Sequence, residues 1–444
     1  PGYLMYSLSP DGHHWSTPEA VAAGHHDLAV ESMHGTCYIV FMGTRAMIDN
    51  LAVILNSQPA TIYVPGDFAT IQQAIDAAGD GDIIEVAPGV YSGNGNRDIE
   101  LRGKAITVRS AEGPEATIID CGAMPDSVDG GGSGGQGGGG KSHRGFYLHG
   151  DPERSGTDDA GYVIRGFTIR NGRIPGSEIP TGGHWSGSES HPIGAGIYCE
   201  LSSPTIVDCV IENCGTEVGG GIGCVGGKPV IVDCRIENCT AGGFGGMRSG
   251  GRGGGIGVIF GCDARISGCV IRSNRSYYNS QGAGLYLRAS NAVVENCEIS
   301  SNTSISETAN VEGAGVYCGR GADIVLSTCV IYNNAGYVGA GLMATRYDNT
   351  GGGDSSTGRN TVRVTNCTIA HNRLIGPQMP PFPGGGIHSV GPDIIVKNSI
   401  VWYNEGAPVF IQQAASKSPV VYSDVEGGYL GQGNIDVDPL VAPT

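Results

Sequence analysis

Residues 297–302 read Cys-Glu-Ile-Ser-Ser-Asn, and this pattern, Cys-x-Ile-x-x-Asn, decides the fold. It returns every 25 to 38 residues through the second half of the chain. In six of seven repeats, a Gly-rich step into an aliphatic residue precedes it by 12 or 13 residues. Repeats of this length with short strand patterns and no helical periodicity predict a stacked solenoid. The Cys position holds Cys209, Cys234, Cys269, Cys297, Cys329, Cys367 and finally Ser399.

The Cys and Ile positions of the repeat lie two residues apart, so in a strand they face the same side. We therefore expect the Cys side chains to point inward and to stack as small apolar thiols. Disulfides between neighbouring coils are the alternative, because strand spacing falls within the Cα separation that a disulfide tolerates. A metal site is disfavoured, because the chain has no Cys-x-x-Cys pair.

The Asn position comes five residues after the Cys. Asn adopts left-handed backbone conformations readily and can bond to an Asn in the next coil. We interpret this column as a structural ladder at a turn. It contains Asn274, Asn302, Asn334, Asn372 and Asn404.

The composition limits the classes of partner. Gly accounts for 77 of 444 residues, which indicates many tight turns, and the net charge is −17. Nucleic-acid binding requires clustered cations, so we expect no nucleic-acid partner. No apolar run reaches the length of a membrane span. The acidic balance is compatible with bound Ca²⁺ and with secretion.

Residues 1–58 lack the repeat, and we predict a small β segment or the end of an upstream domain there, followed by the solenoid over 59–444. The octapeptide at 9–16, Ser-Pro-Asp-Gly-His-His-Trp-Ser, resembles the Asp-box turn of sialidase-like propellers. An ordinary hairpin with Asp-Gly at its turn explains it equally well. A propeller needs several blades, and this segment has room for one.

Residues 61–78 predict a strand, a Pro-Gly turn and a short amphipathic helix with Ile71, Ala74, Ile75 and Ala78 on one face. Together with the strand-like runs up to residue 120, this segment resembles the start of right-handed parallel β-helix proteins of the pectin-lyase-like superfamily. The resemblance implies that the helix closes the open end of the solenoid. Without such a cap the first coil would expose apolar side chains and unpaired strand edges.

The repeats over 194–404 also resemble those of polymorphic outer membrane proteins and related bacterial surface β-helices. This resemblance is informative about the fold and much less so about function, because adhesins and polysaccharide enzymes share the solenoid. The chain lacks the Asn-Thr-Asp and Gly-His-Gly strings of polygalacturonase-type hydrolases. A lyase would instead need a cation or Arg beside the uronate and a base for its α-proton.

Candidate site residues fall in the variable connections between repeats, where function is expected in solenoids. Arg346 and Tyr347, with His371 and His388 in adjacent coils, are the candidates for catalysis. Trp185, Tyr277 and Tyr278 are candidates for stacking on a sugar or a partner. Asp208 and Asp233 are candidates for Ca²⁺ binding, with solvated charge as the alternative.

We thus predict an all-β right-handed parallel β-helix of about ten or eleven coils with an N-terminal capping helix. The favoured function is a secreted or cell-surface structural or adhesive module that assembles head to tail or with other surface proteins. The alternatives are a lyase acting on an acidic polysaccharide and a non-catalytic glycan-binding module.

Overall fold

The chain divides into two compact units, Pro1–Ala60 and Thr61–Thr444. The computed structural model describes residues 59–122, 142–150, 161–174, 192–242, 250–278, 280–305, 313–346, 360–375, 384–412 and 420–440. In the first unit it also describes β1 (Met5–Tyr6) and β2 (Glu19–Ala20), which pair antiparallel. The Asp-box-like motif lies outside the described residues.

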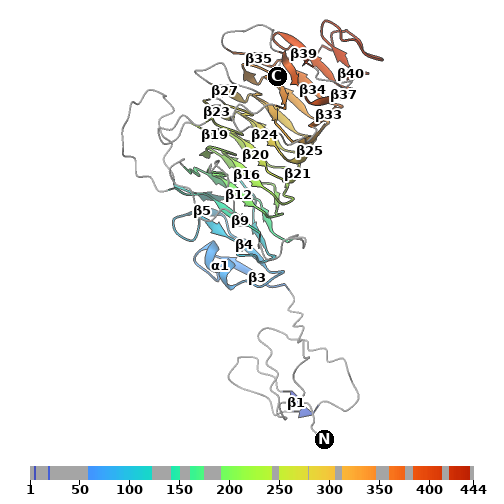
Figure 1. Ribbon diagram of the computed structural model, residues 1–444. Coiled ribbons are helices and arrows are strands. Elements are labelled where there is room, and N and C mark those ends of the chain that lie inside the picture. The colour runs from blue at the N-terminus through green and yellow to red at the C-terminus, as the bar shows by residue number, and fades with distance from the viewer. Residues whose placement is uncertain are drawn as a thin grey trace, which may run out of the picture. The chain divides into compact units, whose positions relative to one another are not determined.

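The second unit is a stack of coils whose strands pair in parallel with the coils before and after (Figure 1). Sheet I contains twelve strands: β3 (Thr61–Val64), β4 (Ile83–Val86), β7 (Thr107–Ser110), β10 (Val163–Arg165), β13 (Thr205–Val207), β17 (Val230–Val232), β21 (Asp263–Ser267), β25 (Asn291–Glu295), β29 (Asp323–Ser327), β33 (Thr361–Thr365), β37 (Asp393–Lys397) and β40 (Val420–Val421).

Sheet II contains eleven strands: β5 (Gly89–Ser92), β8 (Thr117–Asp120), β11 (Thr168–Arg170), β14 (Val210–Glu212), β18 (Arg235–Glu237), β22 (Val270–Arg272), β26 (Glu298–Ser300), β30 (Val330–Tyr332), β34 (Thr368–Ala370), β38 (Ile400–Trp402) and β41 (Asp424–Val425). Each repeat pattern therefore supplies one strand of this sheet.

Sheet III contains ten strands: β6 (Ile99–Glu100), β9 (Phe146–His149), β12 (Ile197–Glu200), β16 (Ile222–Val225), β20 (Ile256–Ile259), β24 (Leu285–Arg288), β28 (Val316–Cys318), β32 (Leu342–Thr345), β36 (Gly384–Val390) and β39 (Ala407–Gln412). Sheet IV is short: β15 (Gly215–Thr216), β19 (Thr240–Ala241), β23 (Arg275–Tyr277), β27 (Thr303–Ile305), β31 (Ala335–Gly336) and β35 (Arg373–Leu374). The predicted count of ten or eleven coils agrees with these sheets.

The predicted capping helix is present as α1 (Ile71–Ala77) at the first coil (Figure 1). Thr70 caps it, because its Oγ1 accepts a hydrogen bond from the Gln73 backbone N–H at 3.3 Å. Ile71 and Ile75 are fully buried against the first coils. The apolar interior is therefore covered at this end, as the sequence predicts.

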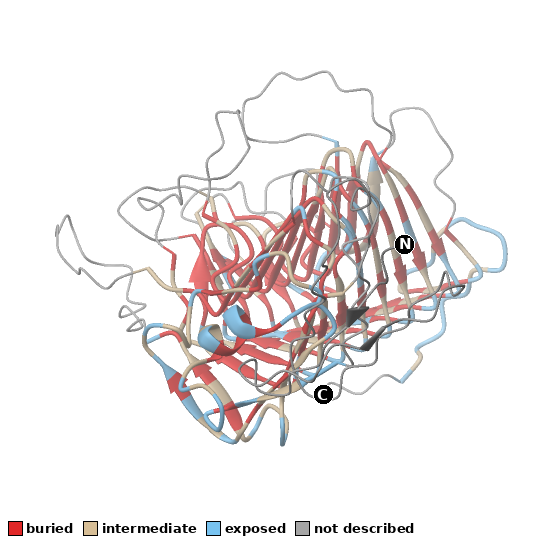
Figure 2. Cartoon of the chain, turned by 90° about the horizontal axis from the view of Figure 1, so that it is seen from below, coloured by how far each residue is buried: buried red, intermediate tan, exposed pale blue. Residues whose placement is uncertain are grey.

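The interior is built from repeat positions that lie directly above one another. Ile236, Ile271 and Ile299 are consecutive partners in the register of sheet II, and all are fully buried. Burying one such side chain contributes about 1.5–3 kcal/mol. Figure 2 shows buried residues running along the strands of successive coils.

The cysteines follow the predicted inward orientation: the thirteen described cysteines are buried free thiols. In the repeat, each thiol donates to the carbonyl two residues before it and to a carbonyl of the preceding coil. For Cys269 the acceptors are Ser267 at 3.3 Å and Ile231 at 3.6 Å. We call Cys209, Cys234, Cys269, Cys297, Cys329 and Cys367 the cysteine column.

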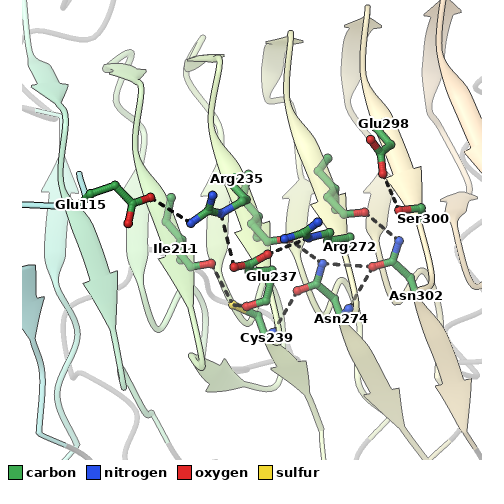
Figure 3. Close-up of polar contacts among 12 residues, drawn as sticks. Glu115, Ile211, Arg235, Glu237, Cys239, Arg272, Asn274, Glu298, Ser300 and Asn302 are labelled. Carbon is green, nitrogen blue, oxygen red and sulfur yellow. Dashed lines mark hydrogen bonds and ion pairs between the residues drawn. The ribbon is translucent and has the colours of Figure 1, made fainter. Parts of the chain in front are cut away.

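The Asn ladder is also present, with one difference from the expectation. Asn274 Nδ2 donates to Asn302 Oδ1 at 3.0 Å, and the Asn274 backbone N–H donates to the same oxygen at 3.0 Å (Figure 3). The left-handed residue, however, is the one before the ladder Asn, as in Ser273 (φ 57°) and Ser301 (φ 56°). This residue makes the corner, which turns the following Asn inward, where its amide must be satisfied by its neighbours.

Candidate functional site

The outer face of sheet II carries a row of paired charges (Figure 3). Glu237 Oε2 lies 2.7 Å from Arg272 Nε, and its Oε1 lies 3.3 Å from Arg235 Nε, an ion pair without hydrogen-bond geometry. Arg235 also lies 3.4 Å from Glu115. The hydrogen bond and charge of Glu237 raise the pKa of Arg272. These arginines are engaged with carboxylates and link one coil to the next.

Asp208 and Asp233, the candidates for Ca²⁺, are exposed corner residues with φ of 52° and 51°. Glu237, the carboxylate on the strand after Asp233, is held by two arginines. Within the described part of the chain, no group of three or more His, Cys, Asp or Glu side chains is placed to hold a metal ion. The left-handed corner gives these two aspartates a structural explanation.

The catalytic candidates lie in separate surroundings. His371 follows β34 and stacks on Tyr403 with ring centroids 4.8 Å apart. His388 is buried on sheet III, where its ring stacks on Phe410 at 4.6 Å and its Nδ1 accepts from the Gly384 N–H at 3.1 Å. Arg346 is exposed just after β32, and Tyr347 lies outside the described residues. Burial lowers the pKa of His388 to about 4, so this ring is neutral near pH 7.

The candidates for stacking on a sugar or a partner are Tyr277, Tyr278 and Trp185. Tyr277 ends β23 of sheet IV, and Tyr278 follows it at a left-handed corner with φ of 54°. Both are half-buried. Trp185 lies outside the described residues.

A different polar cluster, which the sequence did not reveal, lies on the outer face of sheet III in the early coils. β6, β9 and β12 are neighbours in this sheet, and alternation points Tyr147, Tyr198 and Glu200 outward. The chain before β9 adds His143 and Arg144, and the chain before β6 adds Asp98. We call Asp98, His143, Arg144, Tyr147, Tyr198 and Glu200 the Arg144 cluster.

An Asp–His pair orients one side of this cluster. Asp98 sits at a left-handed corner (φ 53°), and its Oδ2 lies 2.6 Å from His143 Nδ1. Its Oδ1 accepts from the Arg144 backbone N–H at 2.9 Å. A carboxylate only accepts, so it selects the tautomer with hydrogen on Nδ1 and leaves a lone pair on Nε2. His143 Nε2 is buried and has no hydrogen-bond partner.

Arg144 occupies the centre of the cluster. Only 6 % of this residue is exposed, and its Nη1 is buried without a hydrogen-bond partner. Its Cζ lies 5.4 Å from the Tyr147 ring centroid and 5.1 Å from that of Tyr198. The two rings are stacked, with centroids 5.3 Å apart. The guanidinium is thus held by aromatic rings, and burial lowers its pKa.

Glu200 completes the cluster as a buried carboxylate. The Tyr147 hydroxyl donates to its Oε2. Burial, and then the bond to Glu200, raise the pKa of Tyr147; burial also raises the pKa of Tyr198. The cluster therefore combines an oriented imidazole, a desolvated cation and protonated phenols. Such a combination can bind an anionic group and transfer a proton.

Comparisons with known proteins address the fold. Residues 248–346 match the family model "Right handed beta helix region". No curated protein matches the chain. Among the described residues, no helix has the length and apolar character needed to cross a membrane.

Several solved structures are similar to the chain. A pectate lyase shares 12 % identity with a TM-score of 0.42, covering 82 % of each chain. A mannuronan C-5 epimerase A-module from Azotobacter vinelandii shares 16 % identity with a TM-score of 0.36, covering 83 % of this chain and 94 % of that one. A pectin methylesterase from carrot shares 13 % identity with a TM-score of 0.35, covering 83 % and 91 %.

These likenesses have TM-scores below 0.5, so the identification of the fold depends on the family model and on the sheets themselves. The sheets of the second unit are parallel throughout, with one strand per coil. The predicted architecture is confirmed: the second unit is a right-handed parallel β-helix.

Proposed function

We propose that the chain is a structural β-helix module, secreted or at the cell surface, that associates through its last described coil. The observation that carries this proposal is the exposure of large apolar side chains in that coil. Leu430 is 98 % exposed and Leu440 is 82 % exposed, and Val437, Ile435 and Tyr422 are exposed in the same stretch of chain, 420–440. Clustered exposed apolar residues are typical of interaction surfaces.

The rest of the repeat supports a structural function. The Cys and Asn columns and the ion pairs of sheet II bond one coil to the next. At the other end, α1 covers the apolar interior. This arrangement supports association of two copies through the last described coil more than the head-to-tail stacking expected from the sequence.

Sedimentation velocity over a range of protein concentrations tests this proposal. We expect association that increases with concentration and that is weakened by Leu430→Ser combined with Val437→Ser. Val330→Ser is the matched control, because Val330 is 43 % exposed in the middle of the solenoid. A monomer at every concentration, or equal loss of association in the control, would refute association through this coil.

The Arg144 cluster favours a second function, β-elimination on a uronate-containing polysaccharide. Arg144 Nη1 would neutralise the uronate carboxylate, and His143 Nε2 would remove the α-proton. The electron pair of that C–H bond would form the double bond, and the glycosidic C–O bond would break. Tyr147 would donate its proton to the leaving oxygen, and Asp98 would orient the imidazole throughout.

The ultraviolet absorbance of the unsaturated product tests this second function on a panel of uronate polymers. We expect His143→Gln to abolish activity and His371→Gln to preserve it. Affinity electrophoresis on the same polymers separates a non-catalytic glycan-binding module from an enzyme. Binding without product would favour the binding module, and equal loss of activity in both variants would exclude His143 as the base.

A further inference from the structure

The interior contains many thiols, which are part of neither the proposed association surface nor the Arg144 cluster. The six thiols of the cysteine column stand at the same position of six successive coils, and each is at most 2 % exposed. Cys199, Cys224 and Cys262 form a second group, and Cys214 and Cys239 a third. Members of a group come from neighbouring coils, as the register pairing of Cys199 with Cys224 shows.

The separation of the coils sets the separation of the thiols. Neighbouring parallel strands lie about 4.8 Å apart. A Zn–thiolate bond is about 2.3 Å long, and two metal–sulfur bonds of about this length placed in line span about 4.6 Å, which is close to this spacing. The column offers pairs of sulfur atoms, since no three metal-binding groups converge among the described residues. Pairs suit cations that prefer two ligands in line and do not suit tetrahedral Zn²⁺.

We propose that the cysteine column binds soft monovalent d¹⁰ cations, Cu(I) or Ag(I), between successive sulfur atoms. Thiolate is the ligand that such cations prefer. Each bound cation forms two S–M bonds, and each thiol that enters the chain loses its proton to solvent. Inner thiolates bridge two cations, so opposite charges alternate along the column and little net charge is buried.

Serine replacements give a clean test, because the chain itself uses Ser in the same column. Ser399 accepts from the Cys367 backbone N–H at 3.2 Å and donates to the Lys397 carbonyl at 2.9 Å. Cys269→Ser with Cys297→Ser should therefore fold. The six thiols form five pairs of successive sulfur atoms, and each pair can hold one cation. The double variant keeps only the pairs Cys209–Cys234 and Cys329–Cys367, so it should bind three fewer cations.

The experiment titrates the reduced full chain with Ag(I) without oxygen and counts bound ions by native mass spectrometry. Circular dichroism checks the fold and gives the melting temperature. We expect release of protons, a higher melting temperature and three fewer ions in the double variant. Cys318→Ala is the control, because its register neighbours, Leu287 and Ala344, carry no sulfur.

Three results would overturn the proposal. The first is equal uptake by the wild type and the double variant. The second is uptake accompanied by loss of the β-sheet signal, which would show reaction with unfolded chain. The third is no uptake by the folded chain or by chain refolded with Ag(I) present.

Discussion

Replacing Asn334 by Ala provides the sharpest test of how the coils are held together. This fully buried side chain takes part in four hydrogen bonds. Its Nδ2 donates to the Ile299 carbonyl at 2.9 Å and to Asn372 Oδ1 at 3.0 Å. Its Oδ1 accepts from the backbone N–H and the Nδ2 of Asn302, both at 3.0 Å.

The expected cost follows from these bonds. Three of them contribute about 1 kcal/mol each, and the orphaned backbone N–H of Asn302 costs about 1–3 kcal/mol. The free energy of unfolding should therefore fall by about 4–6 kcal/mol. Asn334→Cys is the matched control, because Cys239 occupies the same position and its thiol bonds to Ile211 at 3.7 Å. We expect the Cys variant to lose about half as much.

Urea unfolding measures the decrease in global stability, and amide hydrogen exchange at Asn302 measures the decrease in local protection. Exchange at Asn302 should accelerate more in the Ala variant than in the Cys variant. A decrease in the free energy of unfolding below about 1 kcal/mol for the Ala variant would refute this prediction, because it would mean that the ladder hydrogen bonds contribute little to stability. A Cys variant less stable than the Ala variant would also contradict it.

Three further predictions concern other parts of the fold. The pKa of His388 is near 6.5 in the unfolded chain and about 4 in the folded one. The free energy of unfolding should therefore fall by up to about 3 kcal/mol as the pH drops from 6.5 to 4. Urea midpoints measured across this range should show the fall, and His388→Gln should remove the pH dependence. Gly223→Ala should destabilise by at least about 1–3 kcal/mol in thermal unfolding, because its Cβ would lie 2.7 Å from Gly194 N; an unchanged melting temperature would contradict this close approach. Glu237→Gln should lower the free energy of unfolding by about 1 kcal/mol at low salt and by less in NaCl, because Arg272 is half-exposed and salt screens its ion pair with Glu237. A decrease that does not depend on salt would contradict this explanation.

The sequence was most informative where repeats of similar composition stack in register. The Cys position was predicted to form an interior column and the Asn position a ladder at a turn. Both columns are present, because parallel pairing places equivalent residues one above another. The corner conformation was less predictable. The ladder residue and the residue before it are often both Asn or Ser, as in Ser273 and Asn274. Only the path of the chain at the corner decides which of the two adopts positive φ.

The Arg144 cluster could not be predicted from the sequence in the same way. Asp98, His143 and Glu200 belong to successive coils, but excursions of unequal length separate them. With no constant period, nothing in the sequence aligns these residues. The one signal was alternation in Phe146–His149 and Ile197–Glu200, which places polar side chains on an outward face.

The sequence by itself thus determined the solenoid, its capping helix and its interior, because each depends on local periodicity repeated at a nearly constant interval. Only the tertiary structure decided which outward side chains meet. Contacts such as Asp98 to His143 depend on the register between coils. That register is set by parallel strand pairing across excursions whose length carries no periodic signal.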